Sequence, residues 1–141
     1  MKIFKTGELI GKSSRLLTKS LSKNLLLSKT GITPEQWIIL QILSRGSKNQ
    51  KELTEITLKT KATINSLVSY LLKSDLISKN KSTVDNRKVV LAISKKGINI
   101  IDKTKTNART SIKQATKDFS ETEIRVLNNY LSRIITNLHN E

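Results

Sequence analysis

The sequence contains no cysteine, and this absence excludes several kinds of site. Without thiols the chain can form neither a disulfide framework, nor a thiol-based switch, nor a zinc site that uses cysteine ligands. Long apolar runs are also missing, since none exceeds five residues, whereas a membrane-spanning helix needs about twenty. The N-terminus alternates lysines with apolar residues and shows no secretion signal. We therefore expect a cytoplasmic protein without membrane association.

Catalytic residue types are scarce as well. The only histidine is His139, near the C-terminus, where we expect it to be solvated. No paired carboxylates, glycine-rich phosphate loop or metal-ligand spacing stands out. Asp85 and Arg87 come nearest to a catalytic pair, but in a polar basic segment a structural ion pair is the better interpretation. The sequence predicts no enzyme, no metal site and no cofactor.

Acidic residues are few. The chain has eleven Asp and Glu and twenty-six Lys and Arg, which gives a net charge of +15. Such a surface attracts polyanions, so nucleic acid is the leading partner. The charge is concentrated in two segments, residues 1–29 and 61–96, which each carry a net charge of +6. With 141 residues and no break in composition, we expect residues 1–141 to form a single domain.

The stretch from Thr60 to Leu72 organises the rest of the chain. Its apolar residues recur at the spacing of one buried helical stripe, namely Ile64, Leu67, Val68, Leu71 and Leu72. Thr60 is a suitable N-cap. The remaining face carries short hydrogen-bonding groups that suit reading base edges, with Lys61, Thr63, Asn65, Ser66, Ser69, Tyr70 and Lys73. Taken alone, the helix could also be an ordinary amphipathic helix with a solvated polar face.

The residues before this helix favour a role for it in reading DNA bases. Thr33 to Gln36 and Asn49 to Glu52 are capping boxes, which predict helices starting at both places. The first of these helices carries Trp37, expected in the core, and the second is about nine residues long and ends near Lys59. Two short helices joined by so brief a turn are a helix-turn-helix.

After Leu76 the apolar period changes from 3.6 to 2, which predicts strands at 77–80 and 89–94. The connection, residues 81–88, is polar, basic and too long for a tight turn, so it should project as a wing.

Amphipathic helices are predicted at both ends of the chain. One covers residues 3–28, although Gly7 and Gly11 weaken its first half, and a long one begins after Ser94 and continues to Phe119. A capping box at Ser120 to Glu123 opens the last helix. Their apolar seams exceed what one chain can cover, so we expect a homodimer whose interface includes Ile3, Ile10, Ile112, Leu127, Leu131, Ile134 and Leu138.

The predicted fold is mainly α with a small β-hairpin wing: a winged helix-turn-helix lobe at 30–96 and dimerisation helices at 1–29 and 97–141.

This order of elements resembles the MarR family of bacterial winged-helix transcription regulators over about residues 30–138. The resemblance is carried by Gly31 to Trp37 with Leu40 and Leu43, Gln50 to Leu53, Lys61 to Asn65 with Leu71, Asp85 to Arg87, and Leu91 to Gly97. It implies an obligate dimer whose recognition helices enter successive major grooves of a pseudo-palindrome, while each wing places an arginine in the flanking minor groove.

Carried over to this chain, the resemblance implies that Thr63, Asn65 and Ser66 face bases. Arg87 would be the wing arginine and Asp85 would hold the wing tip. The other residues expected at the DNA are Asn49, Lys61, Tyr70, Lys79, Lys81 and Lys88. The resemblance also implies a small aromatic ligand between the dimer helices and the helix-turn-helix, near Leu16, Leu17, Trp37 and Ile101.

Three departures limit the resemblance. Ser66 and Lys79 stand where the family usually has arginine, and Asp75 stands where it usually has glycine. Asp tolerates the left-handed conformation better than most residues, so the fold is not threatened. Without a guanidinium at Ser66 a bidentate guanine contact is lost, which favours an A·T-rich site.

The predicted function is a sequence-specific double-stranded DNA-binding transcription repressor that acts as a homodimer and is released by a small ligand. The alternative is a winged-helix interaction module that binds an acidic partner protein. Affinity that falls steeply with salt and protection of a symmetric DNA site would favour the first.

Overall fold

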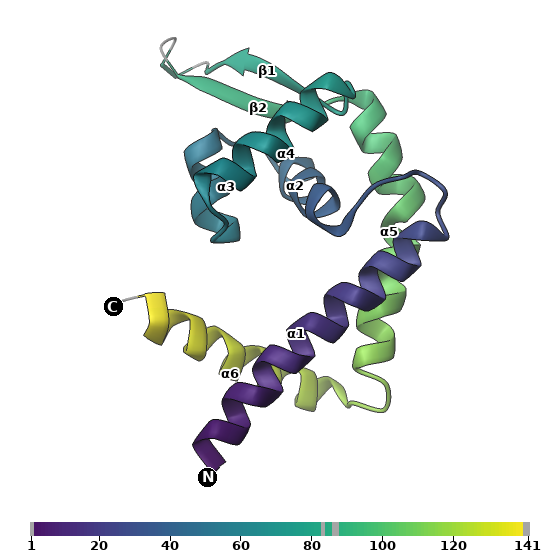
Figure 1. The fold of residues 1–141 in the computed structure, drawn as a ribbon, viewed down its shortest axis with the longest axis vertical. Helices are drawn as coiled ribbons and strands as arrows, with labels where there is room; N and C mark the ends of the chain where they lie inside the picture. Colours follow the sequence, from purple (N-terminus) through teal and green to yellow (C-terminus); the bar gives the residue numbers. More distant parts are fainter. Residues whose placement is uncertain (1, 83, 86–87, 140–141) are drawn as a thin grey trace.

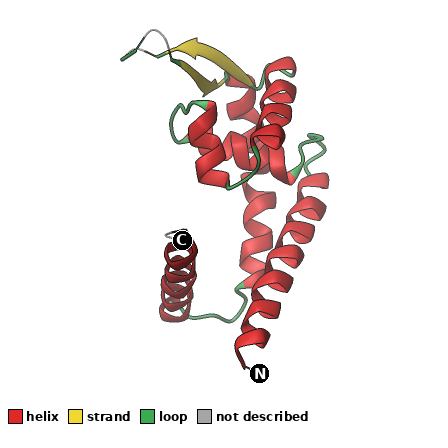
Figure 2. Cartoon of the chain, turned by 60° about the vertical axis from the view of Figure 1, so that its left-hand side comes forward, coloured by secondary structure: helices red, strands yellow, loops and turns green. Residues whose placement is uncertain are grey.

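The computed structural model describes residues 2–82, 84–85 and 88–139, and it confirms a mainly α fold with one β-hairpin (Figure 1). In these residues the elements are α1 (Lys2–Leu26), α2 (Pro34–Ser44), α3 (Gln50–Thr57), α4 (Lys61–Lys73), β1 (Ile77–Lys81), β2 (Val89–Ile93), α5 (Lys95–Ala115) and α6 (Glu121–His139). The hairpin lies at one end of the molecule and the N-terminus of α1 at the other (Figure 2). No helix in the described ranges is long and apolar enough to span a membrane.

The predicted capping boxes start three of the helices. Thr33 opens α2 and Asn49 opens α3, and each pairs reciprocally with the residue three positions later. At the start of α6, the backbone N–H of Ser120 donates to the Glu123 carboxylate at 2.9 Å, and the backbone N–H of Glu123 donates to the Ser120 hydroxyl at 3.1 Å. These contacts supply partners for groups that the helix leaves without intrahelical bonds.

The capping box of α6 also lowers the pKa of the Glu123 carboxyl. The first cause is the hydrogen bond from the Ser120 backbone and the second is the contact with the Ser120 side chain. Because the folded pKa is depressed, the support that this carboxylate gives to α6 is present above the ordinary glutamate pKa and is lost as the pH falls through the lowered value.

The core lies where α2 meets α4, β2 and α5. Its fully buried members include Ile39 and Leu40 of α2, together with Ile64 and Leu71 of α4. Burying each such side chain contributes about 1.5–3 kcal/mol, so this contact fixes which face of α4 turns outward. Leu67 and Leu72 pack against the core at its edge, which completes the predicted stripe.

The hairpin is antiparallel, with Lys79 opposite Leu91 and Lys81 opposite Val89. Lys81 therefore belongs to β1 and not to the connecting tip, so the predicted strand was one residue too short. Lys48 adds a pairing that the sequence did not suggest, because its backbone N–H donates to the Leu91 carbonyl at 3.1 Å and its carbonyl accepts from Leu91 at 2.7 Å. This bridge ties the segment before α3 to the base of the hairpin.

The base of the hairpin is joined tightly to α5. The Ser94 hydroxyl, which caps α5, donates to the Asp75 carbonyl at 2.6 Å, and the Ser94 N–H donates to the Leu76 carbonyl at 3.0 Å. A Cβ added to Gly97 would lie 2.2 Å from the Leu76 carbonyl oxygen, so only glycine permits this approach. Asp75 adopts φ 60°, the left-handed conformation expected for it.

Two helix ends differ from expectation. The third helix ends at Thr57, and Leu58 follows in the left-handed conformation with φ 56°. The long helix α5 ends at Ala115, so Phe119 lies beyond it, after a turn in which Asp118 has φ 65°. The buried residues of α5 are Gly97, Thr104 and Ser111, whereas the apolar Ile98 and Ile112 are about half exposed. The inward face of α5 thus combines the polar Thr104 and Ser111 with Ile100 and Ile101, which pack against the core.

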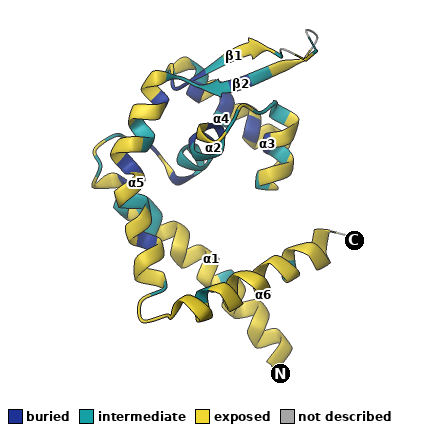
Figure 3. Ribbon diagram, turned by 180° about the vertical axis from the view of Figure 1, so that it is seen from behind, coloured by how far each residue is buried: buried dark blue, intermediate teal, exposed yellow. Residues whose placement is uncertain are grey.

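The helices from the two chain ends are loosely covered. Helix α1 runs beside α5, and α6 buries no residue. In Figure 3, α6 and most of α1 carry the colour of exposed residues. A single chain thus leaves long apolar seams in contact with water.

Candidate nucleic-acid interface

Helix α4 presents two chemically distinct faces. Ile64, Val68 and Leu71 point into the core, with exposed fractions of 3% or less. The exposed residues of α4 are Lys61, Ala62, Thr63, Asn65, Ser66, Ser69, Tyr70 and Lys73. Apart from Ala62, the outward face therefore consists of neutral hydrogen-bonding groups flanked by a lysine at each end.

Asn65 is held by a residue from the neighbouring helix. The Gln50 side-chain amide donates a hydrogen bond to Asn65 Oδ1 across the turn between α3 and α4. A carbonyl oxygen has two lone pairs, so Oδ1 can keep this bond and accept a second one. The Asn65 amide nitrogen donates to no group within the described residues. Asn65 is thus oriented by Gln50 while its donor and one lone pair remain available.

The start of α4 is fixed by Thr60. Its hydroxyl accepts from the Thr63 N–H at 3.1 Å and donates to the Thr63 hydroxyl at 2.9 Å. This leaves the Thr63 hydroxyl able to donate outward. Asn49 has a different role, because its side-chain oxygen accepts from the Glu52 N–H at 2.8 Å as the cap of α3.

The hairpin adds positive charge beside α4. Lys79 and Lys81 lie two residues apart on β1, so they share one face of the strand, and both are exposed. The exposed Lys88 follows at the other side of the tip, where its N–H donates to the Asp85 carbonyl at 3.0 Å. Asp85 is half-buried, and its N–H donates to the Ser82 hydroxyl at 3.4 Å. The predicted wing arginine, Arg87, lies outside the described residues.

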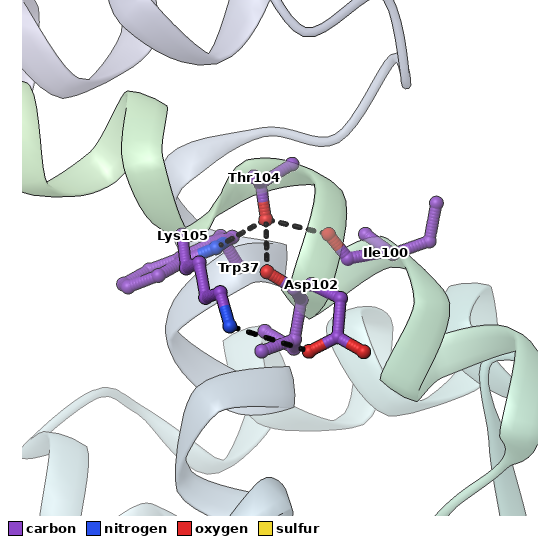
Figure 4. A network of polar contacts seen from close by, with 6 residues as sticks. Trp37, Ile100, Asp102, Thr104 and Lys105 are labelled. Carbon is purple, nitrogen blue, oxygen red and sulfur yellow. Dashed lines mark hydrogen bonds and ion pairs between the residues drawn. The ribbon is translucent and has the colours of Figure 1, made fainter.

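Polar contacts along α5 connect this end of the molecule to α1. The Trp37 indole N–H donates to the Thr104 hydroxyl at 2.9 Å, and that hydroxyl donates to the Ile100 carbonyl at 2.6 Å (Figure 4). Further along, the Asn24 amide donates to the Ser111 hydroxyl at 2.7 Å. Thr104 and Ser111 are buried, and each hydroxyl has a second partner, namely the Ile100 carbonyl for Thr104 and the Ser20 hydroxyl for Ser111. Helix α5 is therefore bonded to α2 and to α1 at defined positions.

An open pocket of about 430 Å³ lies among α1, α2 and α5. Its lining residues are Leu17, Leu21, Trp37, Gln41, Ser44, Ile101, Lys105, Ala108, Arg109, Ser111 and Ile112. Three of the four residues predicted to surround a ligand, Leu17, Trp37 and Ile101, come together here. Leu16 does not line the pocket and is exposed.

The residues predicted for dimerisation are accessible in the single chain. Among them Ile3 is 83% exposed and Leu138 is 63% exposed, and Ile10, Ile112, Leu127 and Leu131 are exposed to a lesser degree. Ile134 is half-buried. Soluble chains rarely leave so many large apolar groups in long rows uncovered.

Comparison with known proteins identifies the family. Residues 21–104, more than half of the chain, match the family described as transcriptional regulator SarA/Rot. The chain belongs to the SarA/Rot family of transcriptional regulators. No curated protein matches the sequence.

Solved structures share the fold of this SarA/Rot-family chain. A probable transcriptional regulator from Pseudomonas aeruginosa is 26% identical, with 92% of this chain and 96% of that chain covered and a TM-score of 0.77. A mutant of MarR from E. coli, complexed with operator DNA, is 18% identical, with 95% and 96% covered and a TM-score of 0.80. BpsR from Bordetella bronchiseptica, whose DNA binding is regulated by 6-hydroxynicotinic acid, is 18% identical, with 94% and 98% covered and a TM-score of 0.76.

These neighbours confirm the resemblance to MarR-family regulators. The SarA/Rot family and its structural neighbours are transcriptional regulators, which fits the expectation of a non-enzymatic protein.

The contacts of two residues at the interface were not predicted from the sequence. Gln50 reads from the sequence as the first residue after a cap, yet its amide reaches Asn65 on the next helix. Lys48 pairs with β2 through its backbone. The helix-turn-helix prediction could have suggested Gln50, because the start of the first helix in such a motif lies near the second. A single bridging residue such as Lys48 has no periodic signal.

Proposed function

We propose that this SarA/Rot-family regulator is a sequence-specific double-stranded DNA-binding repressor that acts as a cytoplasmic homodimer on a pseudo-palindromic site. The observation that carries the proposal is the outward face of α4, where neutral hydrogen-bonding groups stand beside the basic hairpin. Neutral groups at this position suit base edges, and lysines around them suit phosphates.

In this proposal α4 lies in the major groove. Asn65 pairs with adenine, because its free amide donates to N7 while Oδ1 accepts from N6 and keeps its bond to Gln50. Thr63 and Ser66 offer hydroxyls to neighbouring bases. Lys61, Tyr70, Lys79, Lys81 and Lys88 contact the backbone on either side, and Asn49 adds a contact at the start of α3. Asp85 supports the hairpin tip from which Arg87 reaches the minor groove.

The homodimer is supported by the uncovered apolar residues of α1, α5 and α6. A second copy can bury these rows, since a two-fold axis places the same seam on both partners. We assign residues 1–29 and 97–141 to dimerisation and residues 30–96 to the DNA, within a single domain of residues 1–141. The bound dimer represses transcription by occupying its operator.

A small aromatic ligand is proposed for the pocket around Trp37. Its lining combines an aromatic ring with apolar side chains of α1 and α5, together with the basic groups of Lys105 and Arg109. Since Trp37 is bonded to Thr104 on α5, an occupant that prefers one arrangement of α2 and α5 would shift the spacing of the two α4 helices. Release from DNA follows when that spacing no longer fits.

Salt dependence and stoichiometry test the proposal against the rival protein-interaction module. Binding of a labelled duplex is measured by fluorescence anisotropy at several salt concentrations, in parallel with binding of an acidic peptide. We expect affinity for the duplex to fall steeply with salt, by about 0.9 log units per log unit for each phosphate contacted, with two chains bound per duplex. Tight, stoichiometric binding of the peptide and weak binding of every duplex would favour the interaction module.

A further inference from the structure

We propose that the basic face of α1 binds a second segment of duplex DNA, separate from the one at α4, so that the protein joins two duplexes. The basic stripe of α1 consists of Lys2, Lys5, Lys12, Arg15, Lys19 and Lys23, which are all exposed. The proposed function uses none of these groups, although residues 1–29 carry as much net charge as the segment that contains α4. The inference rests on the proposed function for the first duplex only.

The stripe follows one side of α1, where only Glu8 interrupts it, and it lies opposite the apolar seam formed by Ile3, Ile10 and Leu17. Lys5, Lys12 and Lys19 are seven residues apart and so share one side of the helix, about 10.5 Å from one another along its axis. Ile3, Ile10 and Leu17 are spaced in the same way and precede these lysines by two residues, which places them about 200° around the helix. A partner that covers the apolar seam therefore leaves the basic stripe open.

The stripe costs the helix stability in the isolated chain. Lys12, Arg15, Lys19 and Lys23 are three or four residues apart, a spacing at which like charges repel. Within the described residues no carboxylate pairs with any of the six basic groups. Gly7 and Gly11 weaken the same helix further. A bound polyanion would remove the repulsion.

Because of its position, the stripe cannot contact the same duplex as α4. Figures 1 and 2 place the hairpin and α4 at one end of the molecule and the N-terminal half of α1 at the opposite end. Helix α1 has 25 residues and is therefore about 37 Å long, so its first half points well away from the other surface. A straight duplex seated on α4 cannot also lie along this stripe.

Charge and spacing select DNA as the occupant. A second copy of the chain, at +15, is repelled by the stripe. Duplex DNA carries one phosphate per about 1.7 Å of its axis, so a row of cations that runs about 31 Å from Lys2 to Lys23 meets phosphates wherever it lies. DNA is also the polyanion nearest to the stripe, because according to the proposed function α4 binds DNA at the other end of the same molecule.

A bridging experiment tests the inference. One duplex is anchored to beads, a fluorescent duplex of unrelated sequence is added, and its capture through the protein is measured. Replacing Lys5, Lys12 and Lys19 together with Gln keeps the helix propensity similar. We expect capture to fall about tenfold or more, with affinity for a single short duplex changed less than about threefold. The matched control replaces Lys103 and Lys113 of α5 and Lys117 of the following turn with Gln. It removes the same charge and should capture as the wild type does.

Three outcomes would overturn the inference. The stripe variant could bridge as well as the wild type, or the α5 control could lose as much capture. The stripe variant could lose single-duplex binding, which would mean that α1 belongs to the first DNA contact. Stripe-dependent binding of polyglutamate or of anionic vesicles, without capture of the second duplex, would assign the stripe to another polyanion. Failure of the proposed function has a separate signature, because Lys88→Ala would then leave single-duplex binding unchanged.

Discussion

At the scale of single residues, the proposed interface divides into groups that read bases and groups that hold phosphates. Asn65 has a free donor and one free lone pair, which is the pattern that adenine requires in the major groove. Lys88 carries only a point charge at the end of the hairpin. The two kinds of residue should therefore fail differently when they are removed.

Asn65→Ala should relax base preference at one position in each half-site, at a cost of about 1–3 kcal/mol on the preferred sequence. Lys88→Ala should instead weaken all sequences about equally and lower the salt slope by roughly one. Both are measured by competition among duplexes that differ at single positions. Equal losses on every sequence for both variants would mean that α4 is not the reader.

Gln50 should matter only through Asn65. Its amide holds Asn65 Oδ1 from the neighbouring helix, so Gln50→Ala should weaken preference at the same base position, and by less than Asn65→Ala does. In the double variant the loss of Gln50 should add almost nothing, since the side chain that it orients is already gone. Additive losses in this cycle would show that Gln50 contacts DNA independently.

At the scale of elements, local chemistry made the helix starts predictable. Thr33, Asn49 and Thr60 act as caps in the structure, because capping needs only residues within one turn. The inward stripe of α4 was predictable for a similar reason, since the helical period of its apolar residues lies within one short segment of the sequence. The outward face then follows by elimination.

Features that depend on distant partners were not predictable. Nothing in the local sequence marks the polar Thr104 and Ser111 as buried, because their partners Trp37 and Asn24 lie far away along the chain. The apolar period continues to Phe119, yet the chain turns before it through the left-handed Asp118. The contact between Gln50 and Asn65 likewise depends on the angle between two helices.

Gly97→Ala should damage the joint between the hairpin and α5. Its Cβ would meet the Leu76 carbonyl oxygen at 2.2 Å, and backbone cannot move aside cheaply, so we expect a loss of about 1–3 kcal/mol or more. Gly7→Ala is the matched control, because nothing lies within 4 Å and the helix should gain up to about 1 kcal/mol. Urea unfolding at fixed protein concentration measures both. A neutral Gly97→Ala would mean that α5 does not approach the hairpin so closely.

At the scale of the whole molecule, the open question for one chain is what covers its apolar seams. Helix α6 buries no residue, and α1 and α5 leave large apolar groups in water. Net charge of +15 opposes association in general, so a dimer must depend on these seams.

Changing Leu127 and Leu131 together to Asp should abolish both dimerisation and DNA binding, because each charge would be buried unpaired at the interface. Light scattering should then give the mass of one chain. The control places Asp at Asn129 and Ser132, which adds the same charge on the other side of α6. A dimer that survives the first change would show that the interface lies elsewhere.

The central claim is that a two-fold pair of α4 helices reads DNA, and selection of bound sites from a random duplex pool tests it most directly. We predict enrichment of an inverted repeat whose half-site centres lie roughly 10–10.5 base pairs, or one helical turn, apart. Each half should contain an adenine preference that disappears when the selection is repeated with Asn65→Ala. A pool without enrichment, or an enriched site without inverted symmetry, would contradict the account.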